Sequence, residues 1–246
     1  MSPELWLVGT HAVQTALERH PQRVLELRVV RGDPERRLSA VTDIARRAGI
    51  AVQRVDSQGL NKVADAERHQ GIAARFRPLP TLHDGDLAEI VEKTPNPLLL
   101  ILDQVQDPHN LGACLRVAAA SGADAVIVPK DRAAGLTAAV HRASAGTSLI
   151  VPLVQVTNLA RCMEQLKAAG VWIAGAAGEA KQTLYQQDYK GPFAFVLGAE
   201  GEGMRKLTRE KCDHLLRIPM AEDVESLNVS VAAGVFLFEA IRQRAT

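Results

Sequence analysis

Asn110 and Arg116 lie in the stretch LDQVQDPHNLGACLR, where an apolar run leads through a polar loop into a helical pattern. Asn110 is a natural N-cap, and Arg116 follows nearly two turns later, so its side chain can reach back towards the strand ends. Ligands of open α/β sheets sit beyond the carboxyl ends of the strands, which is where this loop falls. For either residue alone, a capping role or a solvated surface position is the preferred interpretation.

Glu200 lies in a second stretch, FAFVLGAEGEGM, where an apolar run passes directly into a loop with three glycines, Gly198, Gly201 and Gly203. Glycines let the backbone approach a ligand closely, which a nucleoside-like cofactor would use. The GxxGxG spacing differs from the GxGxxG of dinucleotide-binding proteins. We expect the carboxylate of Glu200 to need a cationic or hydrogen-bonding partner so close to a sheet edge.

Ser226 and Asn228 belong to a third stretch, LLRIPMAEDVESLNVSVAAGVFLFEA, which predicts a strand, a polar loop and an apolar helix. Both residues are good caps for that helix, and capping alone explains one of them. Two candidates leave one side chain free for another task. Helix N-termini also favour electron-rich oxygens, so this edge suits a polar ligand.

Short apolar runs followed by helical patterns carry these motifs from Pro97 onwards. Continuous apolar runs indicate strands buried on both faces, as in a parallel sheet. The chain is predicted to close with a long helix over Val229–Arg244. The expected strands are LLLILD, ADAVIVP, Leu149–Val154, Val171–Ala176, Phe193–Gly198 and Leu215–Pro219.

The first 76 residues predict a smaller α/β domain, because apolar stretches alternate there with helical patterns. Strands are expected at Val24–Val30, Ile50–Val55 and Gly71–Phe76, and helices at His11–Arg19 and Glu35–Ala48. The following segment, RPLPTLHDGD, is rich in Pro, Gly and Asp and indicates a linker. The sequence therefore divides into residues 1–76, a linker at 77–95 and a larger α/β domain at 96–246.

The composition is that of a globular protein, with 47% hydrophobic residues and a net charge of +1 over 246 residues. Residues 1–76 carry 12 Lys and Arg against 9 Asp and Glu, a net +3, which leaves −2 for the rest. That excess fits phosphate contacts, although a solvated basic face is its commoner meaning. The three cysteines, Cys114, Cys162 and Cys212, form no metal-binding pattern, so we expect reduced thiols, no metal and a cytoplasmic protein without a membrane span.

Taken in order, NxGxxxR, the strand leading into LGAEGEGM, and IPM followed by SLNVSVAAG resemble the three signature motifs of the SpoU branch of the SPOUT methyltransferases. The stretches GTHAVQTALER, HQGIAA and IVPKDRA extend the likeness over nearly the whole chain. The resemblance implies a C-terminal α/β domain tied in a deep trefoil knot with a mainly parallel sheet. It also implies an N-terminal α/β RNA-binding domain similar to ribosomal proteins that bind kink-turns.

The resemblance further implies S-adenosylmethionine as cofactor, bound mainly through backbone groups of the knot loops. By motif position the cofactor contacts are Leu197, Gly198, Gly201, Gly203, Ile218, Met220 and Leu227. The catalytic positions implied by the same motifs are Arg116, Asn110, Glu200, Ser226 and Asn228.

The implied reaction is 2′-O-methylation of a guanosine ribose in 23S ribosomal RNA, in the P loop of the peptidyl-transferase centre. Arg116 is the implied activator of the hydroxyl, yet a guanidinium is almost always protonated. We therefore expect Arg116 either to stabilise a developing alkoxide or to act as a base only after desolvation and a target phosphate rearrange its proton. Glu200 would orient it, and the remaining three residues would position ribose and loop.

Implied partners are 23S ribosomal RNA, or a large-subunit assembly intermediate, and a second copy of the chain. The apolar run Val235–Phe238 fits burial of the last helix against that copy or inside the monomer. Three acids, Glu222, Asp223 and Glu225, should repel RNA, so they face away from it or tune salt and magnesium dependence. Candidate RNA contacts are Arg19, Arg23, Arg46 and Arg47, with His69 and Gln70 as contacts or turn formers.

Three other functions fit parts of the pattern. A transfer RNA ribose methyltransferase would keep the chemistry, but such relatives usually lack this N-terminal domain. A non-catalytic ribosome-assembly protein would tolerate changes at Arg116 and Glu200, and both residues are present. A nucleotide-dependent oxidoreductase needs an acidic residue at the end of the strand after the glycine turn, where Ile218-Pro219-Met220 stands.

Overall fold

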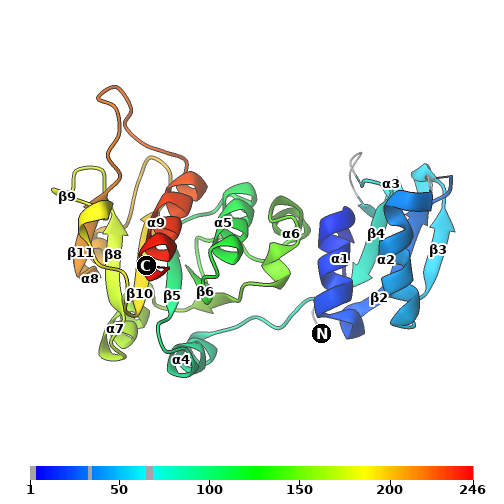
Figure 1. Ribbon diagram of the computed structural model, residues 1–246, viewed down its shortest axis with the longest axis horizontal. Helices are drawn as coiled ribbons and strands as arrows, with labels where there is room; N and C mark the ends of the chain where they lie inside the picture. The colour runs from blue at the N-terminus through cyan, green and yellow to red at the C-terminus, as the bar shows by residue number, and fades with distance from the viewer. Residues whose placement is uncertain (1–3, 33–34, 65–68, 246) are drawn as a thin grey trace. The chain divides into compact units, whose positions relative to one another are not determined.

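The computed structural model of the chain describes residues 4–32, 35–64 and 69–245, with side chains of 35–37 left out. Its contacts divide the chain into two compact units (Figure 1). Unit 1 comprises Met1–Pro80 together with Leu136–Ile150, and unit 2 comprises Thr81–Gly135 together with Val151–Thr246. A short segment from the middle of the chain is therefore grouped with the N-terminal unit, which the sequence did not predict.

Unit 1 is built on a four-stranded sheet in the order β1-β4-β2-β3, in which only β2 and β3 pair in parallel. Helices α1 and α2 pack on each other and on the sheet, and Leu17, Leu27 and Phe76 lie in the shared core. The elements are β1 Leu5–Val8, α1 Thr10–Arg19, η1 Pro21–Arg23, β2 Val24–Val30, α2 Glu35–Arg47, β3 Val52–Val55, α3 Ser57–Ala64, β4 Ile72–Phe76, α6 Ala138–Ala143 and η2 Thr147–Leu149.

His69 and Gln70 form a turn in unit 1. Gln70 has the left-handed φ of 53°, and its Oε1 accepts a hydrogen bond from the backbone N–H of Thr10 at 3.0 Å. The Gly71 N–H donates to Nδ1 of His69 at 2.9 Å. Because both side chains satisfy backbone groups near the start of α1, the structure supports the turn-forming interpretation of this pair.

Unit 2 is built on a seven-stranded sheet in the order β7-β6-β5-β10-β8-β11-β9, and every pairing in it is parallel. Strand β5, which lies between β6 and β10, is buried at all six positions, as its continuous apolar sequence predicts. The elements are α4 Asp84–Lys93, β5 Leu98–Asp103, α5 Pro108–Ala120, β6 Ala125–Pro129, β7 Leu153–Val156, α7 Leu159–Ala168, β8 Trp172–Ala176, β9 Gln182–Thr183, η3 Leu184–Gln186, β10 Phe193–Gly198, α8 Lys206–Lys211, β11 His214–Arg217 and α9 Val229–Arg244.

Helices cover both faces of this sheet. Met163 and Leu166 of α7 share one core with Ala194 and Val196 of β10, and α4 contributes Leu87. The alternate side chains of β10 point to the other face, where the rings of Phe195 and Phe236 of α9 lie 5.3 Å apart. Helices α5 and α9 pack on each other there (Figure 1). The sheet is thus buried between two helical layers.

Two segments differ in secondary structure from what the sequence predicts. The segment 77–95 contains a helix, α4, whose N-terminus is closed by a capping box between His83 and Asp86. The apolar run at Leu149–Val154 begins in the 3₁₀ turn η2, and strand β7 starts only at Leu153. In both places local hydrogen bonding and the parallel partner strand, rather than hydrophobicity, decide where the element begins.

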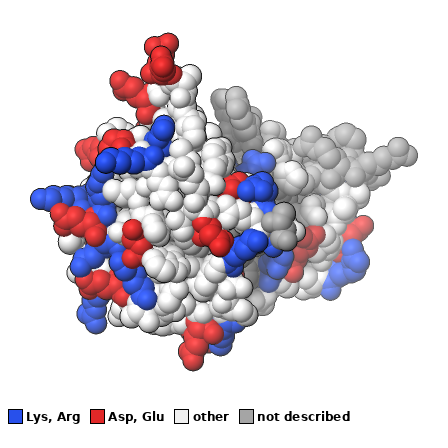
Figure 2. Space-filling model, turned by 60° about the vertical axis from the view of Figure 1, so that its left-hand side comes forward, with Lys and Arg blue, Asp and Glu red and all other residues white. Residues whose placement is uncertain are grey.

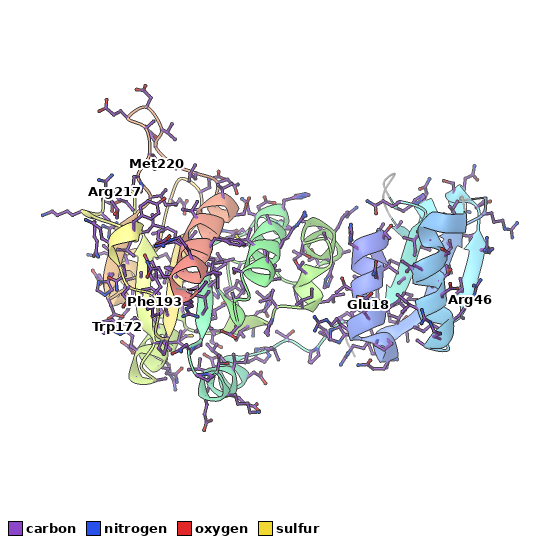
Figure 3. The ribbon with its side chains drawn as sticks, in the orientation of Figure 1. Glu18, Arg46, Trp172, Phe193, Arg217 and Met220 are labelled. Atoms are coloured by element: carbon purple, nitrogen blue, oxygen red, sulfur yellow. The ribbon has the colours of Figure 1, made fainter. Side chains whose placement is uncertain are left out.

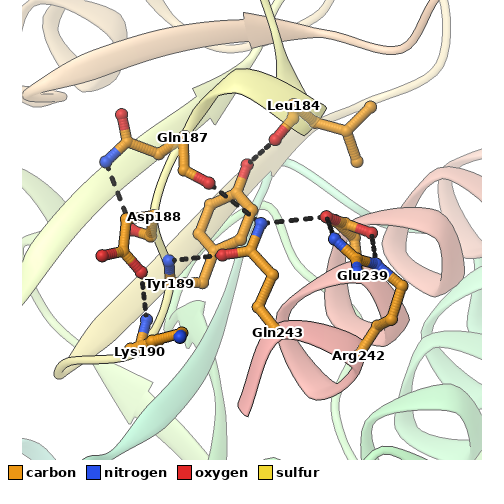
Figure 4. A network of polar contacts seen from close by, with 8 residues as sticks. All are labelled: Leu184, Gln187, Asp188, Tyr189, Lys190, Glu239, Arg242 and Gln243. Atoms are coloured by element: carbon orange, nitrogen blue, oxygen red, sulfur yellow. Dashed lines mark hydrogen bonds and ion pairs between the residues drawn. The ribbon is translucent and has the colours of Figure 1, made fainter. Parts of the chain in front are cut away.

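A polar network attaches the C-terminal half of α9 to the segment before β10 (Figure 4). Glu239 is 8% exposed and accepts two hydrogen bonds from Arg242 at 2.8 Å and one from Gln243 at 2.9 Å. Gln243 in turn accepts from the N–H of Tyr189 and donates to the carbonyl of Gln187. The fully buried hydroxyl of Tyr189 donates to the carbonyl of Leu184 at 2.6 Å.

Replacing Tyr189 with Phe leaves that carbonyl without its donor in a buried site. We expect Tyr189→Phe to lower the free energy of unfolding by about 1 kcal/mol, measured by urea denaturation. Tyr185, which is 57% exposed, offers a matched control. Equal stability of Tyr185→Phe and Tyr189→Phe would contradict the importance of this hydrogen bond.

Candidate functional site

The largest concentration of motif residues surrounds a cavity of about 670 Å³ at the carboxyl edge of the unit 2 sheet. Because β8, β10 and β11 are parallel, the segments that follow them emerge at the same edge. The start of α9 and the loop between β11 and α9 complete the walls. Two motifs distant in sequence therefore meet in one hollow.

All seven positions expected to bind the cofactor line this cavity. They are Leu197, Gly198, Gly201, Gly203, Ile218, Met220 and Leu227. The remaining lining supplies apolar surface from Leu216 and Phe236. Apolar side chains can pack on the flat face of an adenine base, and exposed backbone groups can form hydrogen bonds with its polar edge.

The glycines in this loop have distinct structural roles. The backbone of Gly203 and Met204 crosses Gly198 so closely that a Cβ on Gly198 would lie 2.0 Å from the Gly203 carbonyl carbon. Gly201 and Gly203 take left-handed φ angles of 82° and 68°, and the Gly203 N–H donates to the Ala199 carbonyl at 2.9 Å. The loop is therefore a tight turn folded back over the end of β10, which other residues would disrupt.

The charges around the cavity are mainly negative. Three carboxylates, Glu179, Glu200 and Glu225, line it together with the guanidinium of Arg217. A hydrogen bond from its own backbone N–H and another from Arg209 hold the pKa of Glu179 below its usual range. Such a wall favours a cationic group in the cavity, as the sulfonium of S-adenosylmethionine would be.

Asn110 and Asn228 are brought together from two motifs, at the starts of α5 and α9. Nδ2 of Asn228 donates to Oδ1 of Asn110 at 2.9 Å, while Oδ1 of Asn228 caps α9 by accepting from the Ser230 N–H. The expectation that Asn110 caps α5 is wrong. Asp107 is the cap, because its carboxylate accepts from the N–H groups of His109 and Asn110, and Pro108 occupies the first helical position.

The other three expected catalytic residues are exposed. Glu200 and Ser226 line the cavity, whereas Arg116 lies on α5 outside the lining. Among the residues that the structure describes, no hydrogen bond or ion pair joins Arg116 or Glu200 to another side chain. The expected partner of Glu200 is therefore not found, because water solvates a carboxylate at this exposed position.

The loop between β11 and α9 projects from the sheet edge and carries Met220 (Figure 3). Its three acids, Glu222, Asp223 and Glu225, are exposed, and Figure 2 shows acidic side chains gathered at the tip of a projection. Exposed acids at a tip are solvated, so they need no local partner.

Several lining residues lie outside the three motifs. They come from the end of β8 and the segment after it, and are Ala176, Ala177, Gly178 and Glu179, whereas Ala232 and Phe236 of α9 also line the cavity but belong to the third stretch. The small residues Ala176, Ala177 and Gly178 at the end of a buried strand were the available sequence signal for this segment. The α9 residues gave none, because they fit a core helix equally well.

Of the candidate RNA contacts in unit 1, three are engaged within the chain. Arg23 donates to the carbonyl of Pro78 at 2.7 Å, Arg46 pairs with Asp43 at 3.1 Å, and Arg47 donates to the Asp43 carbonyl. Arg19 is exposed at the end of α1. Of these four arginines, Arg19 has the most guanidinium N–H groups available to bind a phosphate.

The three cysteines are free, and burial raises the pKa of Cys114 and Cys162 to about 12, so both stay as thiols. No group of His, Cys, Asp and Glu side chains in the described ranges is arranged to hold a metal ion. Within those same ranges, no helix has the length and apolar character needed to cross a bilayer.

Family models match both parts of the chain. Residues 97–238 match the SpoU rRNA Methylase family, and residues 6–82 match the family described as RNA 2′-O ribose methyltransferase substrate binding.

Curated relatives are similar over almost their whole length. A Vibrio cholerae protein named 23S rRNA (guanosine-2′-O-)-methyltransferase RlmB is 52% identical over 244 residues, covering 99% of this chain and 98% of the relative. A protein of the same name from Pasteurella multocida is 51% identical over 239 residues, covering 97% and 98%.

Solved structures share the fold. The SpoU methyltransferase AviRb from Streptomyces viridochromogenes, solved with the cofactor AdoMet, superposes with a TM-score of 0.80 at 24% identity, covering 98% of this chain and 91% of that one. A structure described as an RNA 2′-O ribose methyltransferase gives a TM-score of 0.79 at 25% identity, covering 99% and 90%.

The assignment of the α5 cap can be tested on Asp107. We expect Asp107→Ala to lower the free energy of unfolding by about 1 kcal/mol, and Asp107→Ser to recover most of that loss because serine also caps helices. Urea denaturation of both variants measures the difference. If Asn110 were the cap, the Ala and Ser variants would be equally stable.

Proposed function

This chain belongs to the SpoU rRNA methylase family, and we propose that it transfers a methyl group from S-adenosylmethionine to the 2′-oxygen of a guanosine ribose in 23S ribosomal RNA. The observation that carries the proposal is identity of about half of all residues, over nearly the full length of both chains, with relatives named for that reaction. Both family models, for substrate binding and for methyl transfer, match within the one chain. A single chain therefore has both parts that the reaction needs.

The cavity suits the cofactor. Its glycine loop offers backbone groups, its apolar side chains offer contact to a base, and its carboxylates favour a positive charge. Leu197, Gly198, Gly201 and Gly203 would hold the cofactor from one side, and Ile218, Met220 and Leu227 from the other. When bound, S-adenosylmethionine supplies a methyl carbon attached to a positively charged sulfur.

The substrate side of the site has to align a ribose hydroxyl and take up its proton. We assign the alignment to Asn110, Ser226 and Asn228. The hydrogen bond from Asn228 to Asn110 supports this role, because it fixes the relative position of the α5 and α9 starts beside the cavity.

Arg116 is proposed to act on the developing negative charge of the ribose oxygen. A guanidinium has a pKa above about 12, so electrostatic stabilisation is the direct role, and proton removal requires desolvation and a nearby target phosphate. The side chain is exposed, and within the described residues no hydrogen bond or ion pair commits it to another group. Glu200 is proposed to orient it once substrate is bound.

We further propose a homodimer formed through α9. Val231 is 52% exposed and Phe238 is 49% exposed, and their spacing of seven places both on one helical face. Phe236 and Leu237 are buried within the chain instead, so the run Val235–Phe238 serves both the monomer core and an outer apolar surface.

The remaining proposals follow from family membership. The C-terminal domain is proposed to contain a trefoil knot, and the chain to divide into residues 1–76, 77–95 and 96–246. The proposed location is the cytoplasm, where ribosomal RNA is made. The proposed substrate is 23S ribosomal RNA by itself or in an assembly intermediate of the large subunit.

Methyl transfer can be measured with labelled S-adenosylmethionine and purified 23S ribosomal RNA that lacks the modification. We expect label at one guanosine 2′-oxygen, mapped by primer extension, and no label when a fragment carries 2′-deoxyguanosine at that position. Label in transfer RNA alone would reject the proposed substrate and keep the chemistry. Binding of RNA without transfer to any substrate would identify a non-catalytic protein.

Arg116 can be tested by a pH-rate profile of Arg116→Ala and Arg116→Lys. We expect Arg116→Ala to lower kcat by about a hundredfold or more. Arg116→Lys should keep part of the rate, because it retains the charge without the planar fork. Arg161→Ala is the matched control, since Arg161 is an exposed arginine of α7 on the other face of the sheet. Near wild-type turnover of Arg116→Ala would exclude both roles.

A further inference from the structure

Asp103 is a completely buried carboxylate at the carboxyl end of β5, and no motif assigned it a role. It pairs in register with Gly198, the last residue of β10 and the first of the glycine loop. A buried carboxylate is stable only when hydrogen bonds and an opposite charge replace its hydration. A cationic partner that also donates hydrogen bonds is therefore needed to stabilise the Asp103 carboxylate.

That partner is Arg205, the residue at which the glycine loop ends. Its backbone N–H donates to Oδ2 of Asp103 at 2.9 Å, its Nε donates to Oδ1 at 2.8 Å, and its Nη2 lies 2.7 Å from Oδ1. The Arg205 side chain is 39% exposed, whereas that of Asp103 is fully buried, so the ion pair extends from the interior of the sheet to the protein surface. One carboxylate thus binds both the main chain and the side chain of the same residue.

These contacts close the loop of residues 199–205, hereafter the cofactor loop, at both ends. It starts opposite Asp103 at Gly198, folds back through the Gly203 N–H to Ala199 carbonyl bond, and returns to Asp103 at Arg205. Met204 packs into the core beside Gly175, where a Cβ would lie 2.7 Å from Cε of the methionine. Four cavity-lining residues, Ala199, Glu200, Gly201 and Gly203, lie within this closed segment.

We propose that the Asp103–Arg205 pair is a positioning device for the cofactor, holding the cofactor loop closed over Gly198 so that its backbone faces the cavity. The inference rests on the proposed function and adds two positioning residues to it. If the carboxylate loses its charge, Arg205 is no longer drawn to the end of β5 and the loop can open into solvent. Cofactor binding then has to supply the free energy of closing it.

A second carboxylate of similar construction provides a matched control. Asp213 accepts the N–H of Ile173 at 3.0 Å and pairs with Lys167 at 2.6 Å, but it precedes β11 and lies at the amino end of the sheet. It therefore combines a backbone hydrogen bond with an ion pair, as Asp103 does, at the edge away from the cavity. A purely structural effect of losing such a pair should lower the stability at both positions, whereas a positioning effect on the cofactor should appear at Asp103 alone.

The experiment measures the dissociation constant for S-adenosylmethionine by titration calorimetry, and the KM values for cofactor and for RNA, on the full chain. Asp103→Asn and Arg205→Ala are each expected to weaken cofactor binding about tenfold, because each removes a charge-assisted hydrogen bond. Arg205→Lys should give an intermediate value. The KM for RNA should stay within about twofold of wild type in all three, since the pair acts on the cofactor side.

Asp213→Asn is expected to reduce the melting temperature as Asp103→Asn does while leaving cofactor affinity at the wild-type value. Cofactor affinity that is unchanged in Asp103→Asn and Arg205→Ala, or equally weakened in Asp213→Asn, would overturn the positioning role. If Asp103→Asn does not fold, Arg205→Lys decides the question, because it keeps the charge. Failure of the wild-type chain to bind cofactor or transfer methyl would instead reject the proposed function itself.

Discussion

The cavity depends on one close approach of the backbone to itself, at Gly198. Gly203 and Met204 cross that residue with no space for a side chain, which places the turning point of the cofactor loop directly over the end of β10. A Cβ there would push the loop outward and separate the residues that line the cavity from the neighbouring strand ends. The left-handed glycines and the attachment at Asp103 both serve to hold this crossing.

The two edges of the parallel sheet use the same chemistry for different purposes. At the amino edge, Asp124 accepts the N–H of Leu98 and Asp213 accepts that of Ile173, and both bonds satisfy strand termini. At the carboxyl edge, Asp103 binds the end of a loop instead of the start of a strand. Carboxylates stabilise the sheet at one edge and hold a cavity-lining loop at the other.

Asn228 makes two structural contacts with one side chain. Its oxygen caps α9 and its amide nitrogen reaches Asn110 on α5, so the start of one helix is fixed relative to the start of the other. Because Asp107 satisfies the α5 terminus, the amide of Asn110 is available for that contact. Ser226, the alternative cap, stays exposed in the cavity wall.

The sequence by itself determined most of the buried strands, the last helix with both of its ends, the placement of three motifs at strand-to-helix edges, and the family. Hydrophobic runs and motif residues are local properties, so they can be recognised in one dimension. Only the structure decided that Asp107 caps α5, that α4 lies in the expected linker, that the end of β8 lines the cavity, and that Asp103 meets Arg205. The two helix starts depend on side-chain hydrogen bonds to nearby backbone, which hydrophobic patterning does not reveal. Asp103 meets Arg205 because β5 and β10 are neighbours in the sheet, and a strand order of that kind is not a local property of the sequence.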